Sequence, residues 1–373
     1  MSKYKIDKFL IIPIVLFFLI SLVTIYSSQD ILDSSYNVLV LKQIFWYFIG
    51  FGLVFFIMFI KNQTIYKYAW YLYIFGNISL LLLLIFGDEI NNAKCWFDIP
   101  GIGTIQPSEF MKIFLIILLG KMINNFNQKH LNPTVKEEFY FLVIISITVL
   151  IPSILTFLEP DTGVVLIYIL ITLIMLFISG IRYRWFIIFF SIILIIIGIV
   201  LSTYFIDKDL FIKIFGSSFF LRVDRLLAWK SQSGYQLENG IIVIGSSGII
   251  GNGIKNIPLY FPEPQTDFIF ATYSSTFGLL GCLFLFILIA FFDIKLINTA
   301  LKSKNNIDKY IISGIVGMLI YQQFQNIGMT YGLMPITGIT LPFISYGGSS
   351  LLSYMIMLGI IFNISHNIIK DVN

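Results

Sequence analysis

The chain has 373 residues, of which 58% are hydrophobic, 17% aromatic and only 12% charged. An ordinary soluble domain carries roughly 25% charged residues, so this composition excludes that class and indicates a polytopic membrane protein. The net charge of +4 is small, and no nucleic-acid partner is expected. Cys95 and Cys282 lie in different hydrophobic contexts, and His130 and His366 lie in charged segments that are expected to be cytoplasmic, so no zinc cluster is expected.

Apolar runs predict about ten transmembrane helices, because a bilayer core about 30 Å thick takes roughly 20 apolar residues per helix. In chain order they cover 9–27, 38–60, 67–87, 107–123, 139–157, 163–181, 186–205, 268–291, 309–331 and 350–367. We expect one all-α integral membrane domain over 1–373. The first helix is long and lacks a small-residue cleavage site, so we expect it to be retained.

Basic residues are unevenly distributed over the predicted loops. If the N-terminus lies inside, most of the 24 lysines and arginines fall in cytoplasmic segments, whereas acidic residues gather in the external loops. Membrane proteins keep lysine and arginine on the cytoplasmic side. Both termini are therefore predicted to be cytoplasmic, and any chemistry is expected on the external side.

The segment 206–267, between the seventh and eighth predicted helices, is too long for a simple connector. We expect this extracellular loop to fold against the membrane. Closely spaced glycines among apolar residues in 240–253 predict a short amphipathic or re-entrant helix and a tight turn. These glycines lack the lysine of a P-loop and the strand that precedes a dinucleotide fingerprint, so they do not predict nucleotide binding.

The fourth predicted helix opens with a polar group that contains Gln106, Glu109 and Lys112. An ionisable residue in a membrane helix costs roughly 2.5–3.5 kcal/mol on insertion scales, so it tends to face a cavity or a partner. Glu109 and Lys112 are three residues apart and share a helix face. They predict either a structural ion pair or a site where Lys112 neutralises an anionic ligand.

Two further polar groups have simple structural explanations. Glu159–Gly163 is an acidic turn between the fifth and sixth helices. Proline and aspartate are common turn residues, so a structural role is sufficient to explain this sequence. Four amide side chains lie on the apolar ninth helix, where they can form hydrogen bonds between helices: Gln322, Gln323, Gln325 and Asn326.

The run Gly347–Ser350 starts the tenth helix, and free N–H groups at such a start attract phosphate.

Asp267 lies at the outer entrance of the eighth predicted helix. A cap formed by Thr266, with Asp267 in the first turn, is a sufficient structural explanation. Apolar neighbours also raise the pKa of a carboxyl group, which would make Asp267 a proton acceptor near neutral pH. The residues alone leave both interpretations open.

Seven motifs, in this order, resemble the SEDS family, which includes RodA, FtsW and SpoVE. They are Gln106–Lys112, Glu159–Gly163, Gly234–Gln236, Thr266–Ala271, Asn326–Met329, Pro335–Gly338 and Leu341–Ser350. The resemblance spans nearly the whole chain, and Asn326–Met329 with Phe343 looks more like RodA than FtsW. It implies a peptidoglycan glycosyltransferase that polymerises lipid II at the outer face of the bacterial cytoplasmic membrane, for cell elongation and shape. The implied partner is a class B penicillin-binding protein.

The resemblance also implies roles for individual residues. Asp267 matches the family's essential aspartate, which would take the proton of the acceptor GlcNAc 4-hydroxyl. That oxygen would displace undecaprenyl pyrophosphate from the donor MurNAc with inversion. Lys112, Arg222 and Arg225 would balance the charge of the leaving group, with or without a divalent cation such as Mg²⁺. The remaining candidates for substrate binding are Gln106, Glu109, Asp161, Ser349 and Ser350.

The chain departs from the family pattern at a few positions. Cys95 stands where relatives commonly place an arginine, and Asn239 occupies a site that is more often glutamine. Ser275 and Thr276 replace paired acids, and Thr340 replaces a proline. None of these changes removes the expected base, so an active enzyme is predicted.

Two other classes of function fit the same helices. A lipid II flippase or other transporter would need charge along a path to the cytoplasmic side, whereas the candidates here cluster outside, with Lys42 the deeper exception. A noncatalytic scaffold would not need Asp267. Within the family, an FtsW-type or SpoVE-type polymerase for division or sporulation is the alternative to an elongation enzyme.

Overall fold

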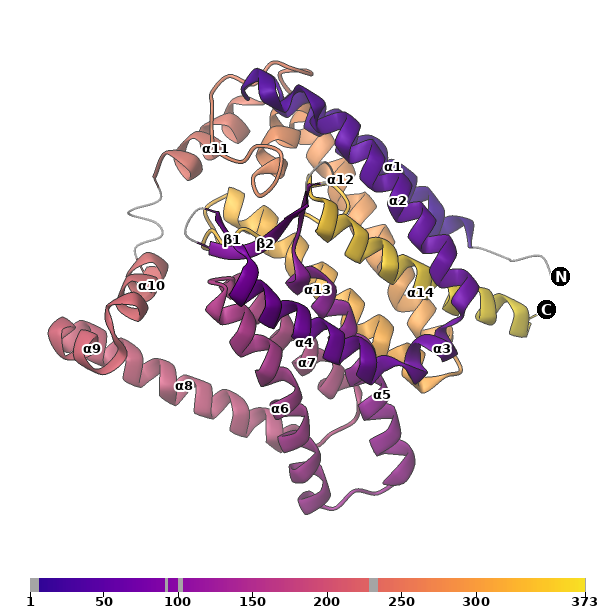
Figure 1. Ribbon diagram of the computed structural model, residues 1–373. Helices are drawn as coiled ribbons and strands as arrows, with labels where there is room; N and C mark the ends of the chain where they lie inside the picture. Colours follow the sequence, from indigo (N-terminus) through magenta and orange to yellow (C-terminus); the bar gives the residue numbers. More distant parts are fainter. Residues whose placement is uncertain (1–6, 91–92, 100–102, 228–233, 373) are drawn as a thin grey trace.

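The computed structural model describes residues 7–90, 93–99, 103–227 and 234–372 (Figure 1). Within these ranges, ten long helices correspond one to one with the ten predicted spans. They are α1 (Lys8–Ser28), α2 (Leu39–Ile60), α4 (Ala69–Phe86), α5 (Pro107–Lys129), α6 (Val135–Leu158), α7 (Thr162–Ile178), α8 (Tyr183–Ile206), α12 (Ile269–Lys302), α13 (Asn306–Thr330) and α14 (Gly348–Val372). The predicted all-α polytopic membrane fold is confirmed.

Shorter elements connect the long helices. The helical ones are η1 (Ser34–Val38), α3 (Asn62–Lys67), α9 (Lys208–Phe215), α10 (Ser217–Leu227) and α11 (Gly234–Ser246). A small antiparallel sheet, which the apolar pattern did not predict, consists of β1 (Asp88–Ile90), β2 (Ala93–Ile99) and β3 (Gly103–Ile105), in the order β1-β2-β3. Strands β1 and β3 have three residues each, and β2 has seven but places Cys95, Trp96 and Phe97 in a row, so none shows a clear alternation of apolar and polar residues.

Seven of the described helices are long and apolar enough to cross a membrane, and α7 is a shorter apolar helix. The two other long helices, α5 and α13, contain buried polar and charged residues. Both lie inside the bundle, where α5 packs against α4, α7 and α13, and α13 packs against α12 and α7. The most polar helices are thus shielded from lipid by the apolar ones.

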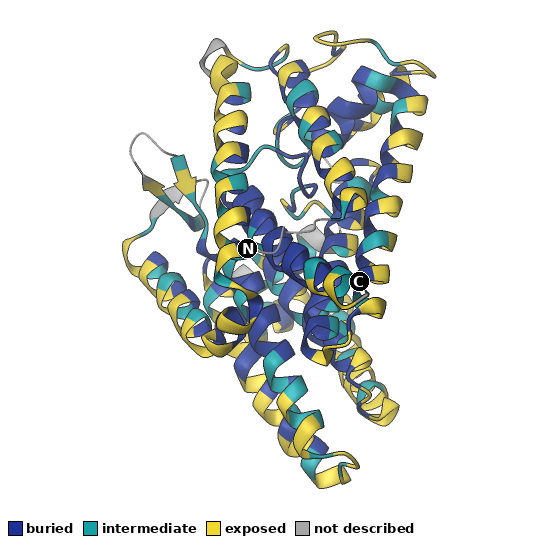
Figure 2. Cartoon of the chain, turned by 90° about the vertical axis from the view of Figure 1, so that its right-hand side faces the viewer, coloured by how far each residue is buried: buried dark blue, intermediate teal, exposed yellow. Residues whose placement is uncertain are grey.

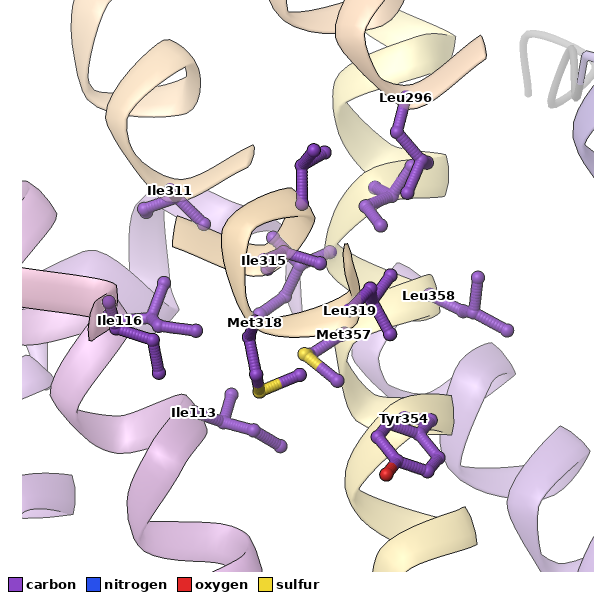
Figure 3. Close-up of a cluster of buried hydrophobic side chains, with 14 of the residues drawn as sticks. Ile113, Ile116, Leu296, Ile311, Ile315, Met318, Leu319, Tyr354, Met357 and Leu358 are labelled. Atoms are coloured by element: carbon purple, nitrogen blue, oxygen red, sulfur yellow. The ribbon is translucent and has the colours of Figure 1, made fainter. Parts of the chain in front are cut away.

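The core of the bundle lies between α5, α13 and α14. Ile113 and Ile116 of α5 face Ile315 and Met318 of α13, with Leu358 of α14 nearby (Figure 3). Buried residues occupy the inner helix faces, and exposed residues the outer ones (Figure 2). Many exposed residues are large and apolar, as a lipid-facing surface requires.

Helix α8 leans away from the other helices in Figure 1. No residue in its most apolar 18-residue stretch is buried. Its first turn is attached to α6, because Trp185 Nε1 donates a hydrogen bond of 2.7 Å to Glu138 Oε2. Between α8 and α12, the helices α9, α10 and α11 agree with the expectation that this long segment folds.

Candidate active site

A cavity of about 520 Å³ lies where α5, α7 and α14 begin. Its walls come from the α6–α7 turn, strands β2 and β3, the loop before α12 and the loop between α13 and α14. These segments are far apart in the sequence but meet at one end of the bundle. The structure thereby brings together six of the predicted site residues: Gln106, Glu109, Asp161, Asp267, Ser349 and Ser350.

Hydrogen bonds from two neighbouring segments hold the backbone around Asp267. Asn326 Nδ2 on α13 donates to the carbonyl oxygen of Asp267 at 2.8 Å and to that of Ile339 at 2.8 Å. Ser345 Oγ donates to the carbonyl oxygen of Thr266 at 2.8 Å. One buried amide therefore joins α13, the loop before α12 and the loop between α13 and α14.

The side chain of Asp267 reaches the cavity and lies outside the apolar span of α12. Within the described part of the chain, no hydrogen bond to its carboxylate is found. Burial raises the pKa of Asp267 to about 7, and the negative charges of Glu263 and Asp161 also contribute. A carboxyl group with this pKa is in part a base at neutral pH.

The predicted cap by Thr266 is wrong. α12 begins at Ile269, and its N-cap residue, Phe268, makes no side-chain capping bond. Thr266 Oγ1 instead donates to Glu263 Oε2 within the preceding loop. The helix start therefore does not account for the carboxyl group of Asp267.

Asp161 combines the capping role with a place in the cavity wall. Its Oδ1 accepts a hydrogen bond of 3.1 Å from the N–H of Val164 at the start of α7, and its Oδ2 accepts one of 2.8 Å from Gln106 Nε2. Burial raises the pKa of Asp161 to about 6. Gln106, predicted to bind substrate, therefore already uses its amide N–H group to hold Asp161.

Lys112 does not line the cavity, although Glu109 does. Lys112 is fully buried behind Glu109, and its Nζ lies 2.7 Å from Glu109 Oε2. Ser353 Oγ on α14 donates to the same carboxylate oxygen at 3.4 Å. The predicted ion pair is confirmed, and the positive charge of Lys112 lies one side chain away from the cavity.

Ser349 and Ser350 line the cavity at the start of α14. Ser349 Oγ accepts a hydrogen bond of 2.9 Å from the N–H of Gln106 and donates one of 3.3 Å to the carbonyl oxygen of Thr104. Ser350 Oγ donates to the carbonyl oxygen of Gly347 at 3.3 Å. Ser349 therefore ties α14 to β3 and α5.

Gln322 and Glu159 are two polar residues of this region that the sequence did not single out as site residues. Gln322 lines the cavity and is 1% exposed, and its Oε1 accepts no hydrogen bond from the described residues. Glu159 is fully buried beside the cavity without a hydrogen-bond partner for either carboxyl oxygen among the described residues, and burial raises its pKa to about 9. The sequence feature that could have identified Gln322 as a site residue is its polar amide on an otherwise apolar helix.

The contacts expected of Arg222, Arg225 and a divalent cation stay predictions. The side chains of both arginines lie outside the described residues, although their backbone belongs to α10. Among the described residues, no group of three or more histidine, cysteine, aspartate or glutamate side chains is arranged to hold a metal ion.

A family model described as "Cell cycle protein", which covers FtsW, RodA and SpoVE, matches residues 4–369. The chain belongs to the SEDS family. The seven sequence motifs and the helix arrangement both agree with this membership.

Curated SEDS relatives align over almost the full length of the chain. The stage V sporulation protein E of Bacillus subtilis (strain 168) is 30% identical, with 98% of each chain covered. The probable peptidoglycan glycosyltransferase FtsW of the same organism is 32% identical, with 96% of this chain and 90% of the relative covered.

Solved structures share the fold. The crystal structure of the rod shape determining protein RodA of Thermus thermophilus matches with a TM-score of 0.71 at 25% identity, covering 98% of each chain. A structure described as showing coordination of polymerization and crosslinking by a peptidoglycan synthase complex matches with a TM-score of 0.80 at 24% identity, covering 97% of this chain and 98% of the other.

Proposed function

We propose that this SEDS protein is a peptidoglycan glycosyltransferase that polymerises lipid II into glycan strands. The observation that carries the proposal is the carboxyl group of Asp267 in the wall of a cavity, with a pKa raised by burial to about 7. The relatives named as probable peptidoglycan glycosyltransferases support the same assignment.

In the proposed reaction, Asp267 takes the proton of the GlcNAc 4-hydroxyl of one substrate. The resulting oxygen nucleophile attacks the anomeric carbon of the donor MurNAc, and undecaprenyl pyrophosphate leaves with the electron pair of the broken bond. One displacement inverts the configuration at this carbon, which converts an α-linked phosphate into a β-glycoside. The leaving group carries its own negative charge, so cations can assist its departure without a general acid.

Lys112 lies behind Glu109 in an ion pair, so it offsets the negative charge that Glu109 would otherwise place in the cavity wall. Arg222 and Arg225 stay proposed contacts of the pyrophosphate. The carboxylates of Asp161 and Glu263 are oxygen ligands of the kind that Mg²⁺ takes. Because pyrophosphate binds cations strongly, the assay should compare EDTA with added Mg²⁺.

The proposed location is the bacterial cytoplasmic membrane, with both termini inside and the cavity open to the outer face. Lipid II is the proposed substrate, and a class B penicillin-binding protein the proposed partner. The solved structure described as a peptidoglycan synthase complex is consistent with such a partner. We further propose a role in cell elongation and shape, since two sequence motifs are more similar to RodA.

The deciding experiment is polymerisation by the purified full chain in detergent with lipid II, with and without the partner. We expect glycan polymer from the wild type and none above background from Asp267→Asn, which keeps the size of the side chain but not its basicity. Asp33→Asn is the matched control, because Asp33 is exposed and makes no capping bond.

If the protein is a flippase, the same purified chain should give a different result after reconstitution into vesicles. Transbilayer movement of lipid II in vesicles, with no polymer under any condition, would replace the polymerase proposal by transport. Full polymerisation by Asp267→Asn would remove the proposed base.

A further inference from the structure

Helix α12 is interrupted three turns after Asp267 in a way that the apolar pattern does not reveal. Gly278 has φ 63° and ψ −161°, which are not helical values. In a continuous helix, the N–H groups of Leu279 and Leu280 would donate to the carbonyl oxygens of Ser275 and Thr276. The interruption breaks both of these bonds inside an apolar region, where unpaired backbone groups are costly.

The turn after α11 replaces both bonds. We call residues 248–253 the clasp. On one side of the break, the clasp accepts two hydrogen bonds from α12, and on the other side it donates two. The four bonds are Leu279 N to Gly248 O at 3.0 Å, Leu280 N to Ile249 O at 3.1 Å, Asn252 N to Ser275 O at 2.7 Å and Gly253 N to Thr276 O at 3.2 Å.

Side chains strengthen the same junction. Asn252 Nδ2 donates to Ser275 Oγ at 3.2 Å. Thr276 Oγ1 donates to Ser27 Oγ at the end of α1 at 2.9 Å, and that oxygen also accepts a hydrogen bond of 3.1 Å from the N–H of Lys255. A side-chain bond thus joins the clasp to the broken helix, and α1 is joined both to that helix and to Lys255, two residues after the clasp.

The close approach of the two backbones depends on glycine. A Cβ atom on Gly251 would lie 2.4 Å from the carbonyl oxygen of Thr276, and a Cβ atom on Gly278 would lie 2.3 Å from the N–H nitrogen of Gly251. Both neighbours are backbone atoms, which cannot move aside as a flexible side chain can. Gly248 and Gly253 also have positive φ, but a Cβ atom there would meet nothing within 4 Å.

The clasp holds one end of a short helical segment whose other end follows Asp267. Residues 269–276 are all buried, so this segment is packed on every side. Asn326 fixes the Asp267 end of the segment through the carbonyl bond described above. The clasp fixes the opposite end, so a shift at the break would be passed along a rigid helical segment to Asp267.

We propose that Gly251 and Asn252 are positioning residues for the proposed glycosyl transfer. By completing the broken α12, they hold segment 269–277 at the depth and rotation that place the carboxylate of Asp267 against the acceptor hydroxyl. This inference rests on the proposed function. It gives Gly251 and Asn252, which precede α12, a role in positioning Asp267 that does not require them to contact the sugars.

The first test compares Gly251→Ala with Gly248→Ala in the polymerisation assay, using the full-length protein with its partner. Both changes put alanine at a positive φ, but only the first one forces the clasp away from α12. A displacement of the base by about 1 Å can cost about a hundredfold in rate. We expect Gly251→Ala to lose about that factor in kcat with KM nearly unchanged, and Gly248→Ala to stay close to the wild type.

The second test uses the side-chain bond, which can be removed without a steric clash. Asn252→Ala and Ser275→Ala should each lower kcat, and the double variant should be no slower than the slower single one, since both remove the same bond. Hydrogen exchange at the amides of Leu279 and Leu280 should accelerate in the variants that lose activity.

The outcomes separate the two proposals. A wild-type protein without polymerase activity contradicts the proposed function itself. An active wild type with unchanged kcat in Gly251→Ala and Asn252→Ala overturns the positioning role, as does an effect confined to KM. If Gly251→Ala does not fold, as judged by its melting temperature in detergent, Asn252→Ala and Ser275→Ala decide the question.

Discussion

At the scale of single residues, the environment of Asp267 decides what its carboxyl group can do. An aspartate in water has a pKa of about 3.9 and would be a weak base at neutral pH. Burial in the cavity wall and the charges of Glu263 and Asp161 raise the pKa of Asp267 to about 7. Its basicity is thereby matched to a reaction in a neutral medium.

The pH dependence of polymerisation follows from this shift. Only the deprotonated form of Asp267 accepts a proton, so kcat/KM should rise with pH up to about 7 and level off above it. Glu263→Gln removes a negative charge that raises the pKa of Asp267, so the midpoint should move to lower pH. Rates measured from pH 5 to 9 check both expectations, with Asp33→Asn as the control that leaves the midpoint in place. A midpoint near that of free aspartate, or an upward shift in Glu263→Gln, would contradict this account.

At the scale of secondary-structure elements, the sequence predicted the helices well, but it did not predict how neighbouring elements join. Runs of isoleucine, leucine and phenylalanine predicted all ten long helices, because the length of a span is set by the bilayer. The sheet β1–β3 and the break at Gly278 were not predicted. The sheet joins short strands that are neighbours in the sequence and lack a clear apolar pattern, whereas the break at Gly278 depends on a distant segment, residues 248–253, which supplies its hydrogen bonds.

The junction at Asn326 leads to a prediction with a matched control. Asn326 donates to Asp267 and Ile339, whereas its neighbour Gln325 donates only to Pro335 O, at 2.8 Å, among the described residues. Each buried carbonyl left without a donor costs about 1–3 kcal/mol, so both alanine variants should melt at lower temperature. Asn326→Ala should also lower kcat, because the loop that carries Asp267 is released. Equal polymerisation rates in Asn326→Ala and Gln325→Ala would show that this amide only stabilises the fold.

At the scale of the whole molecule, the candidate site could be predicted in part. Glu109 and Asp267 stood out as ionisable groups at the mouths of apolar helices, whereas Asp161 was a candidate only through the family resemblance, and the structure brings all three to one cavity. The place of Lys112 behind Glu109 was not predictable, since spacing along a helix does not show which partner faces the cavity. Gln322 was visible as an amide, but only the packing of α13 shows that its side-chain oxygen has no hydrogen-bond partner among the described residues.

Orientation in the membrane can be tested on intact cells. Asp33 lies in a loop predicted to be external, and Leu131, 88% exposed, lies in one predicted to be cytoplasmic. A membrane-impermeant maleimide should label Asp33→Cys and leave Leu131→Cys unlabelled until the cells are opened. The parent chain is a suitable background, because Cys95 and Cys282 are both buried. The reverse labelling pattern would place the cavity on the cytoplasmic side and contradict the proposed location.

The ion pair of Glu109 and Lys112 also constrains how this protein can change over generations. Removing one member of a buried pair leaves a lone charge and costs about 3–5 kcal/mol, whereas exchanging both for apolar residues of similar volume is often neutral for folding. A related protein that has lost one of the two charged residues is therefore expected either to regain it or to lose the other one as well. Loss of both residues is expected to cost little folding stability, but it would remove the carboxylate of Glu109 from the wall of the cavity.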